Sequence, residues 1–297
     1  FRDAFVAEME TVAALSHPHL AAIYDWGTEQ IGKRTTVYIV AEDLSGGSLR
    51  DLFDRGRMLT PSQALMVGLE ACRGLDHAHR NGLVHTELTP AKIVFGDDRR
   101  LRIVDFGLAR MLSEKAWNDP SQLPTHVATY ASPEQAQGHD VTAMTDIYSL
   151  ALILVEAVTG EVPFSGGSTV ATLSARIGRL MPVSADLGPL AAVLERAGRP
   201  EPDERFSAAE FGKALVRAAE RMPRPTPVPI LTPAIVEPDP FTIRRPDDPT
   251  GGIDRPPDEP QPALVDADGK PVAAAASSAV DSPPADTDSP SGPPARR

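Results

Sequence analysis

The chain has 297 residues, 41% of them hydrophobic, and carries a formal net charge of −12 with a pI near 5.0. This length and composition can bury one large core or two modest ones, so most of the sequence is typical of a globular protein. The excess of acidic residues argues against a nucleic-acid-binding protein, because phosphate contacts need a surplus of Lys and Arg.

A disulfide framework is excluded as well, because the chain has a single cysteine, which fits a reducing compartment. Cys72 lies in an apolar helical run, and we expect a buried structural thiol. The longest apolar run, residues 147–158, is interrupted by polar residues and is too short to cross a membrane, so it predicts a buried helix. The chain opens on Phe1 without a basic and apolar leader, and we expect a fragment of a longer protein without a signal peptide.

The first predicted element is a helix over residues 3–16, which ends where Pro18 disfavours further helix. Two β-rich runs follow, residues 23–26 and 36–40. A polar loop with Gly27 and Gly32 joins them, so the pattern predicts two antiparallel strands.

The next predicted elements begin after a turn at residues 45–48. Residues 61–80 have a helical pattern with Thr60 as a candidate cap. Residues 93–95 and 101–104 predict a short hairpin, and from residue 146 to residue 220 the pattern is one helix after another.

The composition changes near Met222: 19 of the 30 prolines fall in residues 222–297, together with 12 acidic and 7 basic residues. Such a segment buries too little apolar surface to offset its ordering entropy. We therefore expect a folded domain over 1–220 and a disordered linker over 221–297, with docking of its proline-rich start into an aromatic groove as the alternative. The final arginine pair would suit the cytoplasmic flank of a membrane helix beyond Arg297.

The most informative motif is His85-Thr86-Glu87-Leu88-Thr89-Pro90-Ala91-Lys92, with Asp105-Phe106-Gly107 following its histidine by twenty residues. The pattern resembles H-R-D-L-x-x-x-N and D-F-G of protein kinases. Further landmarks stand in the expected order, namely Ser132-Pro133-Glu134, Asp146 and Arg205. Over residues 3–218 the chain is similar to the bacterial Ser/Thr protein kinases of eukaryotic type, especially the membrane-anchored actinobacterial ones.

The resemblance implies an α+β, kinase-like two-lobe fold with a partial N-lobe over 1–42 and a mostly helical C-lobe over 43–220. The glycine-rich loop and the strand lysine of the family are absent from this chain. The structural frame of the family corresponds here to six residues: His85, Phe106, Gly107, Glu134, Asp146 and Arg205.

The same resemblance implies ATP and Mg²⁺ as cofactors, with ATP or ADP as small-molecule partner. Glu8 corresponds to the helix glutamate that pairs with the strand lysine, with an ordinary solvated carboxylate as the less favoured alternative. Glu42 and Leu44 fall in the hinge whose backbone binds adenine, Val94 would pack under the adenine ring, and Asp105 would bind the metal.

The reactive positions of the motif are altered. Glu87 replaces the catalytic aspartate and keeps a carboxylate with one more methylene, whereas Thr89 removes a positive charge beside the transferring phosphoryl group. Lys92 replaces the metal-binding asparagine, and an ammonium has no lone pair for Mg²⁺. Lys92 could reach Asp105 and partly stand in for the metal, with a side chain that points to solvent as the alternative. Thr86 lacks the charge with which the family's arginine binds an activation-segment phosphate.

Two function classes follow. The preferred hypothesis is a pseudokinase, a nucleotide-sensing or scaffolding module in signalling with an unidentified protein partner. The alternative is a slow ATP-dependent Ser/Thr protein kinase, a transferase that uses Glu87 as base. We expect either to lie in the cytoplasm, with tethering to the inner face of the cell membrane through a segment beyond Arg297 as a further expectation. A metal site made of His77, His79 and His85 is a weaker hypothesis, because the kinase frame accounts for His85.

Overall fold

A computed structural model describes residues 2–32, 34–106 and 123–230, and the following account is confined to them. The chain divides into two units, residues 1–237 and 238–297, of which the second lies outside the described residues. Gly107, one of the predicted frame residues, also lies outside them.

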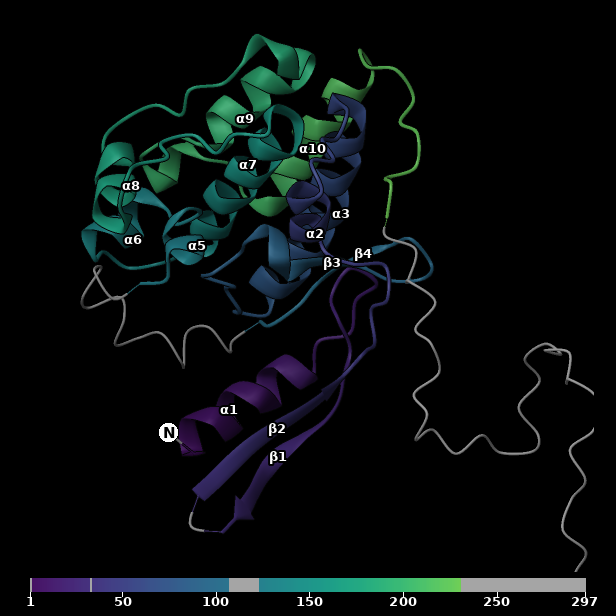
Figure 1. The fold of residues 1–297 in the computed structure, drawn as a ribbon, viewed down its shortest axis with the longest axis vertical. Coiled ribbons are helices and arrows are strands. Elements are labelled where there is room, and N and C mark those ends of the chain that lie inside the picture. Colours follow the sequence, from purple (N-terminus) through teal and green to yellow (C-terminus); the bar gives the residue numbers. More distant parts are fainter. Residues whose placement is uncertain (1, 33, 107–122, 231–297) are drawn as a thin grey trace, which may run out of the picture. The chain divides into compact units, whose positions relative to one another are not determined.

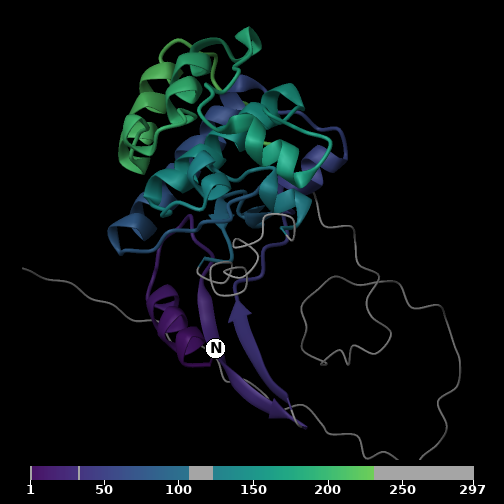
Figure 2. The same cartoon turned by 90° about the vertical axis from the view of Figure 1, so that its left-hand side faces the viewer.

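The first part of the chain consists of one helix and a two-stranded antiparallel ribbon (Figure 1). Helix α1 (Arg2–Ala13) lies beside strand β1 (Ile23–Ile31), as both views show (Figures 1 and 2). Strand β2 (Arg34–Ala41) pairs with β1. Phe5 packs edge-on against Trp26 with ring centroids 5.9 Å apart, which fixes the helix on the ribbon. The predicted helix and antiparallel strands are confirmed.

Both strands are longer than predicted, and the loop was wrongly placed at Gly27. Gly27 lies within β1, opposite Tyr38 in β2. A Cβ at Gly27 would lie 2.8 Å from the Tyr38 hydroxyl, so glycine lets the tyrosine ring cross the ribbon. The reversal is instead at Gly32, which has φ +63°.

Polar caps begin the two helices that follow the ribbon. Ser48 and Asp51 form a capping box at the start of α2 (Leu49–Asp54). Thr60 and Gln63 form another at α3 (Pro61–Arg80), which confirms the predicted helix and its cap. Cys72 in α3 is buried, as expected, and burial raises the pKa of its thiol.

A short 3₁₀ helix, η1 (Pro90–Lys92), leads into the predicted hairpin of β3 (Ile93–Phe95) and β4 (Leu101–Ile103), which is confirmed. Backbone bonds tie the hairpin to the loop between α1 and β1: Ile103 N donates to His19 O and Ala21 N donates to Ile103 O, each at 3.0 Å. This connection brings the first part of the chain against the loop that follows α3.

The remainder is helical. Helix α7 (Ala143–Thr159) is buried over nearly its whole length and packs against α3 and α10 (Figure 1), so the apolar run 147–158 is a core helix, as predicted. None of the helices in the described ranges is long and apolar enough to span a bilayer. The other elements here are α5 (Thr125–Ala128), α6 (Pro133–Gln137), α8 (Thr169–Arg176), η3 (Ala185–Leu190), α9 (Ala191–Ala197), η4 (Pro202–Glu204) and α10 (Ala208–Ala219).

The residues that directly follow the change in composition contact helix α3. Ser62 Oγ donates to Pro223 O at 2.8 Å, and Gln63 Nε2 donates to Thr226 Oγ1 and to Pro227 O at 3.0 Å each. Prolines keep their carbonyl acceptors while lacking an N–H, so side-chain donors on α3 can hold them. Residues 223–227 thus lie against α3, whereas the disordered linker stays a prediction that mostly concerns residues 231–297, outside the described ranges.

Candidate functional site

A buried carboxylate organises the loop that follows α3. Asp146, in the first turn of α7, is fully buried and accepts bonds from His85 N and Thr86 N, each at 2.8 Å. His79 Nε2 lies 2.8 Å from the same carboxylate. A buried carboxylate is tolerated when it is hydrogen-bonded in this way, and its two bonds to backbone N–H groups fix the loop at residues 85 and 86.

Thr86 carries backbone strain at this point. Its φ is +67°, in the left-handed region that a β-branched residue rarely adopts. The Thr86 N–H donates to the Asp146 carboxylate, and Gln135 Nε2 donates to the Thr86 carbonyl at 2.7 Å. Because both peptide groups of the residue are held by buried partners, the strained conformation persists.

His85 connects this loop to the residues after β4. Its Nε2 lies 3.0 Å from Val104 O, its Nδ1 accepts from Glu87 N at 3.3 Å, and its ring meets Phe106 edge-on with centroids 4.8 Å apart. Burial lowers the pKa of His85, and the Lys92 charge acts in the same direction against the opposing effect of Asp146. A neutral imidazole with Nε2 as donor and Nδ1 as acceptor satisfies both bonds.

Glu134 and Arg205 form a second buried link. The guanidinium pairs with both carboxylate oxygens at 2.8 Å each, and Thr145 Oγ1 also donates to Glu134 at 2.8 Å. Burial alone would raise the pKa of Glu134, but the bonds and charge of Arg205 outweigh it and lower that pKa. The pair joins the start of α6 to the residue that follows η4.

The loop itself contains the altered positions. Glu87 is half-buried, whereas Thr89 is 4% exposed and its Oγ1 has no hydrogen-bond partner among the described residues. Lys92 Nζ contacts Asp105 Oδ2, in the pairing that its position in the motif suggested. The side chains of Lys92 and Asp105 are 32% and 42% exposed, so this ion pair faces solvent.

A cavity of about 280 Å³ lies between the ribbon and the hairpin. Its lining is mostly apolar, and Glu42 and Asp105 are the charged residues among it. Four predicted nucleotide- or metal-binding residues line this cavity together with the frame residue Phe106, namely Glu42, Leu44, Val94 and Asp105. Glu87, Thr89 and Lys92 do not line it. Glu8 lies in α1, but its side chain is outside the described part of the chain.

The backbone beside the cavity differs between the two hinge positions. Glu42 N donates to Ala22 O at 2.8 Å, and the Glu42 carboxylate pairs with Arg102 Nε at 2.9 Å. Within the described residues, the Leu44 N–H has no hydrogen-bond partner. Leu44 lines the cavity and its N–H is available as a donor, whereas the N–H of Glu42 is already used.

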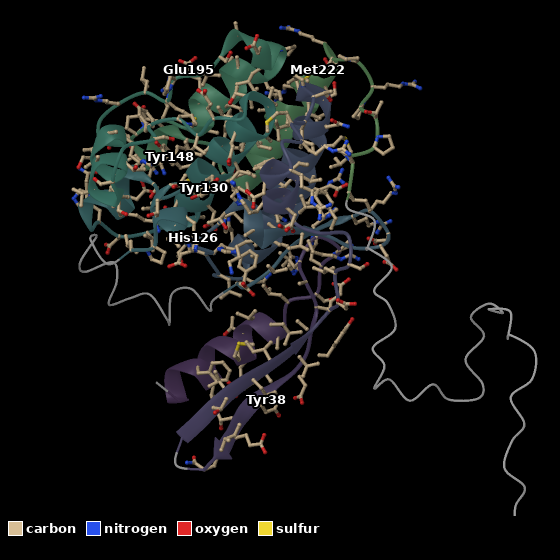
Figure 3. The ribbon with its side chains drawn as sticks, viewed as in Figure 1. Tyr38, His126, Tyr130, Tyr148, Glu195 and Met222 are labelled. Atoms are coloured by element: carbon tan, nitrogen blue, oxygen red, sulfur yellow. The ribbon has the colours of Figure 1, made fainter. Side chains whose placement is uncertain are left out.

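Sequence reasoning missed a polar network that holds the segment between α5 and α6. Arg50 Nη2 donates to Glu156 Oε1 and to Tyr130 OH at 2.7 Å each, and Tyr130 OH donates to Glu156 Oε2 at 2.6 Å. Figure 3 shows Tyr130 among the helices. A glutamate in an otherwise apolar run was the available signal, because such a residue needs a buried partner.

Arg176 on α8 holds the same segment and was also missed. It is fully buried and donates to Ala131 O and, at 3.1 Å, to Thr129 O. Burial lowers the pKa of its guanidinium. The segment from residue 129 to residue 131 is thus held from α7, α2 and α8 by side chains far apart in sequence.

Comparisons with known proteins agree with this arrangement. A family model described as protein kinase domain matches residues 2–210. The serine/threonine-protein kinase PknB of Mycolicibacterium smegmatis is 36% identical over 225 residues, covering 73% of this chain and 36% of that protein. PknB of Mycobacterium tuberculosis is 35% identical over 234 residues, covering 75% and 37%, and PknA of the same species is 34% identical over 235 residues, covering 77% and 54%. The chain thus spans about a third to a half of the length of these relatives.

Proposed function

The chain belongs to the protein kinase family, among the bacterial serine/threonine kinases of eukaryotic type, and on this premise we propose that it is a pseudokinase. It would act in signalling as a nucleotide-binding or scaffolding module that does not transfer phosphate. Phosphoryl transfer requires a positioned hydroxyl, Mg²⁺ bridging the phosphates and neutralisation of developing charge. Each altered residue of the loop affects one of these requirements.

The observation that carries the proposal is the contact between Lys92 and Asp105. In the family these positions belong to the two residues that hold Mg²⁺. Here one is a cation without lone pairs, and it engages the carboxylate of the other. Because Mg²⁺ requires a near-octahedral shell of oxygen ligands, this residue pair does not fit it.

Two further positions weaken the chemistry. Glu87 is one methylene longer than aspartate, which displaces the carboxylate by about 1 Å, and misplacement of that order can cost roughly 10²-fold in rate. Thr89 is buried without a charge where the family has a lysine, so developing negative charge on a phosphoryl group would lack that stabilisation.

Nucleotide binding is the function that the cavity supports. The apolar walls of the cavity, which include Val94, suit a purine ring. The Leu44 N–H would donate a hydrogen bond to the edge of that ring. Asp105 at the same cavity marks the end towards which the phosphates would extend. The volume of about 280 Å³ is near the lower end of small-molecule pockets, roughly 300 Å³.

A slow kinase is the second candidate, because Glu87 retains a carboxylate and Asp105 remains solvent-accessible. Transfer of radiolabelled phosphate by the full-length protein, compared with Asp105→Asn, separates the two functions. The pseudokinase predicts no label above the Asp105→Asn background. Label that is lost in Asp105→Asn and in Glu87→Gln, with both variants folded, would refute the pseudokinase and identify Glu87 as the base.

We further propose a cytoplasmic location, where ATP or ADP is available and the thiol of Cys72 would stay reduced. Attachment to the inner face of the membrane remains a prediction that concerns sequence beyond Arg297. Fractionation of cells that express the full-length protein tests both statements.

A further inference from the structure

The backbone fixes the contact between Lys92 and Asp105. Lys92 ends η1 and directly precedes β3, whereas Asp105 comes two residues after β4. The strands pair with Ile93 opposite Ile103, and Val104 N donates to Lys92 O at 3.0 Å. This register places Lys92 opposite Val104, so Asp105 follows directly after the residue that Lys92 faces, and the hairpin keeps the two residues close together.

Asp105 is also held from its other side. Its φ is +63°, in the left-handed region, and the carbonyl before it lies 3.0 Å from His85 Nε2. In this conformation Asp105 lines the cavity. The contact of His85 with the Val104 carbonyl thus lets the buried frame position Asp105 towards a ligand in the cavity.

Lys92 supplies positive charge at the place where the family uses a metal ion. An ammonium has three donors, so one carboxylate contact leaves others for phosphate oxygens. Because the lysine is covalently attached, it is present at a high effective concentration, with which a free divalent cation must compete. A divalent cation close to Lys92 would also be repelled by its charge.

We infer that this protein binds an adenine nucleotide without a divalent cation, with Lys92 as a built-in counter-ion shared between Asp105 and the phosphates. The inference rests on the proposed nucleotide-binding function and deepens it. It makes Lys92 a ligand-binding residue and assigns metal-free nucleotide as the ligand class. The exposure of the pair, 32% and 42%, leaves the ammonium accessible to a phosphate group.

The test is calorimetric titration of the full-length protein with ATP, once with EDTA and once with Mg²⁺. Three proteins are compared: wild type, Lys92→Asn, and Lys213→Asn as a matched change on the exposed face of α10. We expect the wild-type Kd and that of Lys213→Asn to differ by less than about twofold between buffers. In Lys92→Asn the amide oxygen can bind metal, and we expect Mg²⁺ to tighten ATP binding by about tenfold or more.

Binding of ATP to the wild type only with Mg²⁺ would overturn the inference, as would a Lys92→Asn protein without metal dependence. Absence of binding in both buffers would also overturn it, while leaving the scaffolding form of the proposed function intact. If Lys92→Asn does not fold, Lys92→Gln takes its place, and the two wild-type titrations decide in any case. Phosphate transfer by the wild type would refute the pseudokinase separately, because these titrations measure binding alone.

Discussion

The buried frame and the catalytic loop are joined through His85 and Thr86, yet their charged residues lie in different surroundings. In the frame, Glu134, Asp146 and Arg205 are at most 4% exposed, and each carboxylate is multiply hydrogen-bonded. In the loop, Lys92 and Asp105 form an ion pair that faces water. Breaking a buried pair is costly, whereas a solvated pair contributes little to stability. The frame therefore maintains the fold, and the loop can change its chemistry without loss of the fold.

The strongest test of this contrast is Arg205→Met, which leaves Glu134 buried without its partner. We expect the free energy of unfolding to fall by about 3–5 kcal/mol, measured by urea unfolding of the full-length protein. The control is Arg80→Met in α3, where the pair with Asp76 is 71% and 26% exposed and the expected loss is below about 0.5 kcal/mol. Equal losses of unfolding free energy in the two variants would show that the buried and the exposed ion pairs contribute alike to stability.

Acidification tests the frame through His85. Its pKa is lowered in the folded protein from 6.5, chiefly by burial, so near pH 6.5 the unfolded chain takes up a proton that the folded protein does not. The stabilising contribution is complete above pH 6.5 and is lost as the pH falls from there towards the folded pKa, with a slope of at most about 1.4 kcal/mol per pH unit.

Thermal unfolding between pH 7.5 and pH 5 measures this dependence. His85→Asn should flatten it below pH 6.5, whereas the exposed His139→Gln should not. His17 has a lowered pKa as well, from burial and from the nearby His19 and His77, so part of the slope will persist in His85→Asn. An unchanged slope in His85→Asn would show that His85 is not held neutral by the frame.

The strained backbone of Thr86 lies where the loop joins the frame. A substitution that relieves this strain tests how tightly the frame depends on this residue. Asparagine tolerates a positive φ better than a β-branched residue, so Thr86→Asn should raise the free energy of unfolding by about 1 kcal/mol. Thr169→Asn, at a helical position of α8, is the control and should not stabilise the protein. A loss of stability in Thr86→Asn would mean that the threonine side chain matters more to the frame than its backbone strain.

Local patterns predicted the helices and strands well, because a feature such as the capping box of Thr60 with Gln63 depends on only four consecutive residues. The frame was accessible only through family resemblance, since Glu134 and Arg205 are 71 residues apart. Glu156 in its apolar run indicates that a buried partner is needed, but no local pattern identifies Arg50, 106 residues away, as that partner. Composition showed that residues 223–230 could build no core of their own, but it could not show that α3 offers donors for their carbonyls.

The smallest expected effect on stability belongs to Lys92→Met, and it completes the contrast with Arg205→Met. Both replace a cation by the same apolar side chain and strip a carboxylate of its partner, but Asp105 stays hydrated when Lys92 is removed. We expect the free energy of unfolding to change by less than about 0.5 kcal/mol, by the same urea titration. A loss above about 2 kcal/mol would place this ion pair in the frame. A small change would mean that the side chain at position 92 contributes little to the stability of the fold and can serve ligand binding instead.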